Sequence, residues 1–280
     1  MKEYREELFV GERAMYNTHG ASFIDCTFAD GESPLKESSE LELNNCIFKW
    51  KYPLWYSKNI KVTNTTWLET ARSGIWYTDN IVIKNSLIEA PKQFRRSKNI
   101  TIENTMIPNA EEFLWTCEDI TLKNVQAQGN YFGMNSKNIR IDNFTLSGNY
   151  AFDGASNIEI HNAKMNSKDS FWNCENVTIY DSTIVGEYLG WNSKNLTLVN
   201  CTIDSNQGMC YIDGIKMVNC KLLNTDLSFE LCSNVDATIT TKIDSVKNPI
   251  SGRIEARKIE ELIMDKEMID PSKTTIITKE

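Results

Sequence analysis

The sequence is poor in histidine and in long apolar runs, and each shortage excludes a class of function. Only two of its 280 residues are histidine, His19 and His161, so a histidine-rich metal site cannot be assembled. Catalysis would then depend on carboxylates, Arg, Lys, Tyr or Cys. No stretch is long and apolar enough to span a bilayer. We therefore expect no metal, no cofactor and no membrane partner.

Basic residues are outnumbered, and the cysteines lack a metal-binding spacing. The chain has 30 Lys and Arg against 38 Asp and Glu, a net charge of −8, which argues against a nucleic-acid partner. None of the eight cysteines forms a Cys-x-x-Cys pair, so zinc and dithiol redox interpretations are weak. Residues 1–10 lack the apolar core of a secretion signal. We expect a cytoplasmic protein with reduced thiols.

What the sequence does contain is a repeat with a period near twenty residues. The phrase Ser-Lys-Asn-Ile occurs at 57–60, 97–100 and 136–139, and returns with Leu at 193–196. We call the residue before the first aliphatic of each copy the anchor. Successive anchors lie 19 to 21 residues apart, and they are Gly20, Glu40, Asn59, Asn80, Asn99, Asp119, Asn138, Asn157, Asn176, Asn195, Gly214 and Asn234.

The alternation after each anchor is that of a strand. Segments such as 60–62, 81–83 and 177–179 place two β-forming side chains on one face. A leucine-rich repeat would need its own leucine frame and a helix in each turn, and neither is present. The sequence therefore predicts an all-β protein, a single-stranded right-handed parallel β-helix of eleven to twelve coils with about three short strands per coil.

The fifth position after the anchor is almost always Asn. Asn tolerates left-handed backbone angles, so it suits a tight turn between strands. Stacked turns would let the amides bond from coil to coil as an asparagine ladder. A row of Asn that contacts a sugar is the less favoured alternative. The residues are Asn64, Asn85, Asn104, Asn124, Asn143, Asn162, Asp181, Asn200 and Asn219.

Several cysteines share inner positions of neighbouring coils. Cys201 and Cys220 both lie six residues after an anchor, whereas Cys117, Cys174 and Cys232 lie two before one. Adjacent parallel strands are about 4.8 Å apart, which is compatible with a disulfide. Buried thiols that act as small apolar groups remain the favoured interpretation.

The two ends of the chain lack the repeat. We expect an N-terminal cap at 1–19, the β-helix at 20–240 and a C-terminal cap segment at 241–280. Residues 259–266 have a spacing compatible with either a helix or a strand, and 274–277 indicate a short final strand.

The fourth position before the anchor carries an unusual series, which we call the aromatic row. The position before it is mostly Phe, Leu or Ile, so period-two alternation would bury that residue and turn the aromatic row outward. A covering loop, the N-terminal segment or another subunit are alternatives, and a slip by one residue would bury the row. The row consists of Trp55, Trp76, Arg95, Trp115, Met134, Asp153, Trp172, Trp191, Cys210 and Glu230.

Charged residues and tyrosines precede the row by three or four positions. Flat aromatic faces beside hydrogen-bonding side chains suit a carbohydrate. We predict a binding face on which carboxylates from successive coils act as acid or base in glycoside hydrolysis. The candidate catalytic residues are Asp153, Asp169 and Glu187. The candidate substrate-binding residues are Arg95, Arg96, Trp115, Lys168, Trp172 and Trp191. In a lyase, Arg95, Arg96, Lys92 or Lys168 would neutralise a uronate or serve as base.

Five segments have a distinctive sequence. They are Gly31-Glu32-Ser33-Pro34-Leu35-Lys36, Lys51-Tyr52-Pro53-Leu54-Trp55-Tyr56, Gly74-Ile75-Trp76-Tyr77, Gly186-Glu187-Tyr188-Leu189-Gly190-Trp191 and Ser245-Val246-Lys247-Asn248-Pro249. These segments resemble one bacterial family, called domain of unknown function 3737, and the likeness covers nearly the whole chain. The resemblance implies a single-domain, pectate-lyase-like right-handed β-helix in a bacterial protein, with no established activity and no catalytic residue to transfer.

Three functions stay open on the sequence. The protein is a carbohydrate-active hydrolase or lyase, a glycan-binding module without turnover, or a scaffold whose tryptophan face is an oligomer or partner interface. Turnover, retention without turnover, and concentration-dependent association that buries tryptophan would distinguish them. The oligomeric state is left undetermined.

Overall fold

The computed structural model describes residues 1–279 and divides into two compact units, unit 1 (Met1–Thr145) and unit 2 (Leu146–Glu280). Both are built from coils of a parallel β-helix, and the described residues contain no α-helix. The predicted all-β, right-handed parallel β-helix is confirmed. The predicted count of eleven to twelve coils is wrong, because the chain makes about 15 turns.

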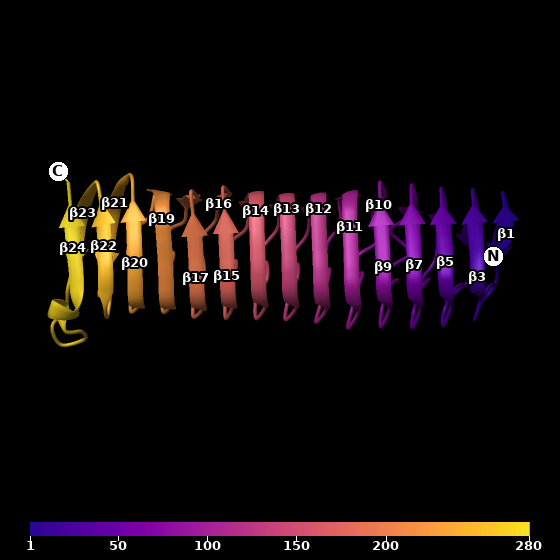
Figure 1. The fold of residues 1–280 in the computed structure, drawn as a ribbon, viewed down its shortest axis with the longest axis horizontal. Coiled ribbons are helices and arrows are strands. Elements are labelled where there is room, and N and C mark those ends of the chain that lie inside the picture. The colour runs from indigo at the N-terminus through magenta and orange to yellow at the C-terminus, as the bar shows by residue number, and fades with distance from the viewer. Residues whose placement is uncertain (280) are drawn as a thin grey trace. The chain divides into compact units, whose positions relative to one another are not determined.

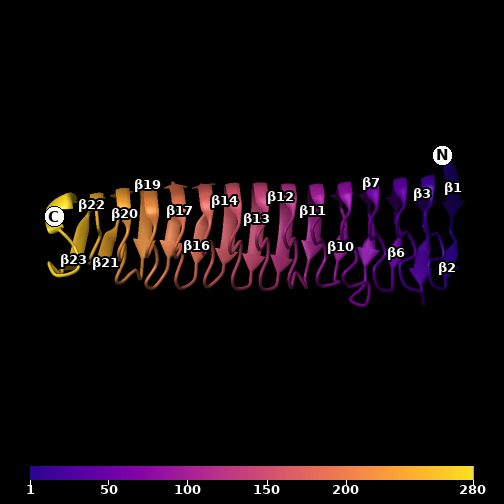
Figure 2. The ribbon, with the colours of Figure 1, turned by 90° about the horizontal axis from the view of Figure 1, so that it is seen from below.

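In unit 1 a longer strand alternates with a shorter one from β1 to β10, and the two strands of a coil then merge into the continuous strands β11 and β12 (Figures 1 and 2). The chain passes into unit 2 within β13 (Lys137–Ser147). The strands of unit 1 are β1 (Lys2–Arg5), β2 (Leu8–Val10), β3 (His19–Ile24), β4 (Thr27–Ala29), β5 (Ser39–Asn44), β6 (Ile47–Phe48), β7 (Lys58–Thr63), β8 (Thr66–Trp67), β9 (Asp79–Lys84), β10 (Leu87–Ile88), β11 (Lys98–Ile107) and β12 (Glu118–Gln128).

Unit 2 continues the pattern and then departs from it near its end. The strands are β14 (Ser156–Asn166), β15 (Glu175–Tyr180), β16 (Thr183–Val185), β17 (Lys194–Val199), β18 (Thr202–Asp204), β19 (Asp213–Leu223), β20 (Ser233–Ile239), β21 (Lys242–Lys247), β22 (Gly252–Ala256), β23 (Lys258–Ile263) and β24 (Thr274–Thr278), with one 3-10 turn, η1 (Pro271–Lys273). The ambiguous residues 259–263 are thus a strand, and the short final strand is confirmed.

Like residues of successive coils pair in register. Ile60 pairs with Ile81, and Ile81 with Ile100, and all three are buried. The pairing extends past the predicted limits, since β1 pairs with β3 and β22 with β24. These outer coils lack the Asn anchor, which is why the repeat alone gave too few turns. Of the segment 241–280, predicted as a C-terminal cap, the structure describes residues 241–279, and Glu280 lies outside the described residues.

The Asn positions form ladders on the outside of the turns. Asn104 has a φ of 49° and donates to Asn85 at 3.1 Å, while Asn124 donates to Asn104 at 2.8 Å. The predicted asparagine ladder is confirmed. The anchors form a second ladder that the sequence did not reveal, in which Asn99 donates to Asn80 at 2.8 Å. At both positions the side-chain amides form hydrogen bonds with the same position of the neighbouring coils, and the left-handed backbone angles of these residues turn the chain.

In most coils the third side is not a strand, contrary to the expected three strands per coil; near the end of unit 2, β21 does lie on this side, since Val246 forms a parallel bridge with Ser228. The residues of this side at seven, five and three positions before the anchor have positive φ, as at Tyr150, Phe152 and, in the next coil, Asp169. A backbone turned at every second residue does not alternate in and out. Two neighbouring residues such as Phe113 and Leu114 are therefore both buried. Bulky residues rarely adopt left-handed angles, so packing must hold them there.

Inside the coils, hydroxyls and thiols bridge one turn to the next. The Ser97 hydroxyl accepts from the backbone N–H of Thr78 at 3.0 Å and donates to the Ile75 carbonyl at 3.2 Å. Cys174 takes the same place, and its Sγ donates to the Phe152 carbonyl at 2.9 Å. All eight cysteines are free and buried. Burial raises the pKa of the Cys117 thiol to about 12. These thiols are structural rather than nucleophilic.

Candidate functional site

The aromatic row lies on the third side of the coils, and its tryptophans face outward, whereas its last two members, Cys210 and Glu230, are buried. Leu54 and Phe171, one position earlier, are fully buried, whereas the tryptophans of the row are half-buried. The predicted direction of the row is therefore confirmed, although the alternation that led to it holds only locally. The indoles are neither freely exposed nor enclosed in the core.

In unit 1 the row is a continuous stack. Trp55 and Trp76 are parallel, with ring centroids 5.1 Å apart and 7° between their planes. The Arg95 guanidinium follows, 4.6 Å from the Trp76 ring and 5.0 Å from that of Trp115. The indole N–H of Trp76 donates to the Lys92 carbonyl at 2.9 Å, and that of Trp55 to the Ser73 carbonyl at 2.5 Å. Ring faces and N–H groups are thus engaged within the protein.

The cations of unit 1 are also paired. Arg95 donates to a Glu112 carboxylate oxygen at 2.8 Å, and Lys92 lies 3.0 Å from the other oxygen. Arg96, the next residue, is exposed and has a φ of 52°. Of the three residues predicted here, Arg95 and Trp115 contact each other, and Arg96 points to solvent. Their role in substrate binding stays a prediction.

In unit 2 the row is irregular. Trp191 stacks on Tyr211, with centroids 5.4 Å apart and 13° between planes. Trp172 meets Trp191 at 55° and 5.7 Å, and it meets Tyr150 edge-on at 89° and 6.5 Å. The preceding residue of the row is Asp153 rather than an aromatic residue. Trp172 therefore has no parallel ring on its face, unlike Trp55, Trp76 and Trp191.

Of the carboxylates predicted in unit 2, Asp169 contacts this group of aromatic residues through a hydrogen bond with Tyr150. Asp169 lies seven residues before its anchor, the position that Tyr150 and Tyr188 hold in the neighbouring coils, and it is only 3% exposed. Burial raises the pKa of the Asp169 carboxyl, and the nearby Lys168 and a Tyr150 hydrogen bond oppose the effect in part. A buried carboxyl with a raised pKa is a candidate proton donor.

The other predicted residues surround Asp169 unequally. Lys168 lies 3.0 Å from Glu187 and over the Tyr188 ring at 5.4 Å. The Asp169 backbone N–H donates to the Glu187 carbonyl at 2.9 Å. Asp153 instead accepts from the Asn173 amide at 2.9 Å, at the start of a third polar ladder.

We call the whole set the acidic–aromatic band, and Tyr150 and Tyr188 are its additions to the predicted residues. Their signal was the shared position with Asp169, seven before the anchor. The band consists of Tyr150, Asp153, Lys168, Asp169, Trp172, Glu187, Tyr188 and Trp191.

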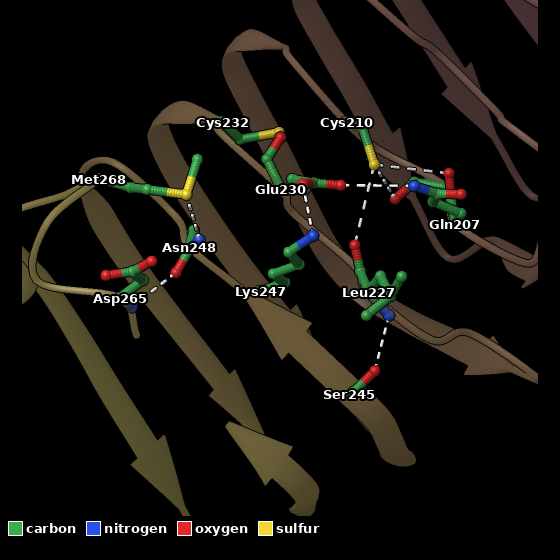
Figure 3. Close-up of polar contacts among 11 residues, drawn as sticks. Gln207, Cys210, Leu227, Glu230, Cys232, Ser245, Lys247, Asn248, Asp265 and Met268 are labelled. Carbon is green, nitrogen blue, oxygen red and sulfur yellow. Dashed lines mark hydrogen bonds and ion pairs between the residues drawn. The ribbon is translucent and has the colours of Figure 1, made fainter. Parts of the chain in front are cut away.

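The last two members of the row form a separate polar cluster (Figure 3). Glu230 is buried and pairs with Lys247 at 2.8 Å, while Gln207 donates to its other oxygen at 3.4 Å. Burial and the Glu230 charge raise the pKa of the Cys210 thiol to about 12. That thiol donates to backbone carbonyls, including Gln207 at 3.5 Å. The cluster is a buried hydrogen-bonded group, and its Cys210 thiol is not activated as a nucleophile because its pKa is raised.

Two further properties concern the described residues 1–279. No group of three or more His, Cys, Asp and Glu side chains there is arranged to hold a metal ion. No helix in this part of the chain has the length and hydropathy of a membrane span.

Comparisons with known proteins support the fold. The family described as Protein of unknown function (DUF3737) matches residues 2–277, and no curated protein matches the chain. The A-module of the mannuronan C-5 epimerase AlgE6 of Azotobacter vinelandii is 11% identical, with 85% of this chain and 87% of that chain covered and a TM-score of 0.51. The Streptococcus pneumoniae surface adhesin PfbA is 10% identical, with 85% and 84% covered and a TM-score of 0.49. At 11% identity the likeness to the epimerase module concerns the fold alone.

Proposed function

Because the chain belongs to the family described as Protein of unknown function (DUF3737), whose description names no activity, we propose a function from the site itself. The protein binds a carbohydrate on the acidic–aromatic band of unit 2. The proposal is supported by two features of one coil: Trp172 has no parallel ring on its face among the described residues, and Asp169, three residues earlier, is a buried carboxyl that is hydrogen-bonded to Tyr150. A sugar ring stacks its C–H face on an aromatic ring and gives its hydroxyls to carboxylates.

The charges of the band favour a neutral or amino sugar. Asp153, Asp169 and Glu187 stand against Lys168 alone, and Lys168 is already paired with Glu187 at 3.0 Å. A uronate would add a negative charge next to three carboxyl groups, which is unfavourable. The lyase alternative is weakened for the same reason, because Lys92 and Arg95 are likewise paired with Glu112.

If the protein cleaves its glycan, Asp169 is the residue suited to donate the proton. Its raised pKa keeps the carboxyl protonated at higher pH than an ordinary aspartate. Glu187 in the next coil and Asp153 in the preceding one are the available carboxylates for the second role in glycoside hydrolysis.

The test is a glycan array of neutral, amino and uronic oligosaccharides, followed by titration of the hits with intrinsic tryptophan fluorescence. We expect Trp172→Ala to weaken binding at least tenfold. Trp76→Ala is the matched control, because Trp76 holds the same row position within the stack of unit 1. Far-UV circular dichroism verifies that both variants are folded.

Two outcomes would remove the proposal. One is the absence of any hit among the three glycan classes, and the other is an equal loss of affinity in both variants. If the wild type instead associates with increasing concentration and its tryptophan fluorescence shifts, the row serves as an interface. For turnover, Asp169→Asn is expected to abolish cleavage while it retains binding.

A further inference from the structure

One side of unit 1 presents a line of outward side chains without any charge. It lies on the second strand of each coil, where the outward residues of successive coils pair in register. Six successive coils carry only Leu, Ile, Met or Thr at this position. We call this line the uncharged stripe, and it consists of Leu8, Thr27, Ile47, Thr66, Leu87 and Met106.

The larger side chains of the stripe are exposed. Leu8 is 64% exposed, Met106 55% and Ile47 36%. In unit 2 the same position carries Lys164, Thr183, Thr202 and Lys221, which is an ordinary composition for a solvated strand. A run of exposed apolar side chains on a sheet face is typical of a surface that associates with another protein.

The neighbouring outward position carries two charges of opposite sign. Lys49 and Glu89 lie two residues after Ile47 and Leu87, and Leu68 lies between them in the intervening coil. Neither charge forms an ion pair within residues 1–279. Each coil rises about 4.8 Å, so this line reads as a cation, an apolar residue and an anion at even spacing.

We propose that the uncharged stripe is the contact surface of a homodimer, in which it packs against the stripe of a second copy of this chain. A two-fold axis along the strand direction, placed at Thr66, reverses the order of the coils in the second copy. Ile47 of one copy then faces Leu87 of the other. Lys49 faces Glu89 in the same way, and each of these contacts occurs twice.

The order of the charges favours a second copy over another partner. A cation, an apolar residue and an anion are complementary to the same series read backwards, so both ion pairs form together. Leu68 lies between them and meets its own counterpart. A partner with one sign of charge would attract Lys49 or Glu89 and repel the other. The stripe lies on the second strands and the aromatic row on the third side, so this proposal is independent of glycan binding.

The size of the surface limits the strength of the dimer. Six coils of about 4.8 Å, and about four residues of 3.3 Å across them, give a patch of roughly 30 Å by 13 Å. Stable complexes bury about 800 Å² on each partner, and this patch is smaller. We therefore expect a reversible dimer with a dissociation constant of about 10 to 100 µM.

The experiment is sedimentation velocity of the full chain from about 1 to about 500 µM, a range that spans the expected dissociation constant. The wild type should change from monomer to dimer across it. Lys49→Glu and Glu89→Lys should each weaken association at least tenfold, because two attractive contacts in the dimer become repulsive. An equimolar mixture of the two variants should associate like the wild type, since each supplies the charge that the other lacks.

Two controls separate this surface from others. Lys164→Glu makes the same charge reversal at an exposed lysine of β14, at the position of the stripe in unit 2, and should have no effect. Trp172→Ala should also leave association unchanged, which separates the stripe from the aromatic row. Far-UV circular dichroism verifies that all variants are folded.

The proposal is overturned if the wild type stays monomeric at the top of the concentration range. It is also overturned if Lys164→Glu or Trp172→Ala weakens association as much as Lys49→Glu does. Association of Lys49→Glu and Glu89→Lys alone at wild-type strength would place the interface elsewhere. Failure of their mixture to associate would show that the two residues do not face each other, and it equally rejects the proposed dimer.

Discussion

Replacement of Arg95 tests whether the stack of unit 1 is a structural device. The guanidinium lies between two indoles at 4.6 and 5.0 Å, and each such contact contributes about 0.5–1 kcal/mol at a partly exposed site. The ion pair with Glu112 at 2.8 Å adds about 0.5–1 kcal/mol. The buried Nε of Arg95 has no hydrogen-bond partner, which offsets part of the gain. We therefore expect Arg95→Gln to lower the free energy of unfolding by about 2 kcal/mol.

The assay is urea unfolding followed by far-UV circular dichroism, with the slope of the transition compared between variants because solenoids need not unfold in two states. Arg95→Lys should give an intermediate loss, since it keeps the charge but not the planar stacking surface. Lys61→Gln is the control, because Lys61 is an exposed residue of β7 that pairs with Glu42 at 3.1 Å. A loss below about 0.5 kcal/mol in Arg95→Gln, equal to that expected of an exposed ion pair, would refute the reasoning.

Three further predictions concern stability. The raised pKa of Asp169 means that the folded state holds a proton more tightly than the unfolded chain, so the stability of the wild type falls as pH rises from about 4. Asp169→Asn should therefore be more stable than the wild type at pH 7, and the difference should vanish in acid. Urea unfolding across pH measures both effects. Asn104→Ala should cost about 2–3 kcal/mol, from two ladder bonds and an unfavourable φ of 49°, while Asn104→Gly should cost about 1 kcal/mol less in the same assay. Trp67 is fully buried with an unpartnered Nε1, so Trp67→Phe should change stability by less than about 1 kcal/mol, whereas Phe48→Ala should cost about 3–5 kcal/mol in parallel thermal melts.

The fold could be predicted from the repeat in the sequence because every coil has the same local requirements. An aliphatic pair such as Ile81 and Ile83 must be buried, and an Asn such as Asn85 allows the chain to turn. Both requirements act within a few residues, so they leave a visible pattern. The direction of the aromatic row followed from the buried Phe and Leu one position before it.

Only the tertiary structure decides which tryptophans of the row are stacked and which keep a face without a parallel ring. Trp76 and Trp172 occupy the same repeat position, yet the first is stacked between Trp55 and Arg95 while the second lacks a parallel ring. The difference depends on the side chains of the neighbouring coils, twenty residues away in sequence. The left-handed backbone of the third side could not be predicted either, because hydrophobic periodicity does not reveal backbone angles.

The bend of unit 2 at Thr240 and Thr241, and the opening of about 640 Å³ beside it, could not be predicted from the repeat. A period predicts only what recurs, and the bend at Thr240 and Thr241 is the place where recurrence stops. Lys242 and Lys258 are sixteen residues apart, a spacing unlike the period of the coils, and only the pairing of β21 with β23 brings them together. Local patterns thus fixed the coils, whereas contacts between unlike segments created the acidic–aromatic band and this opening.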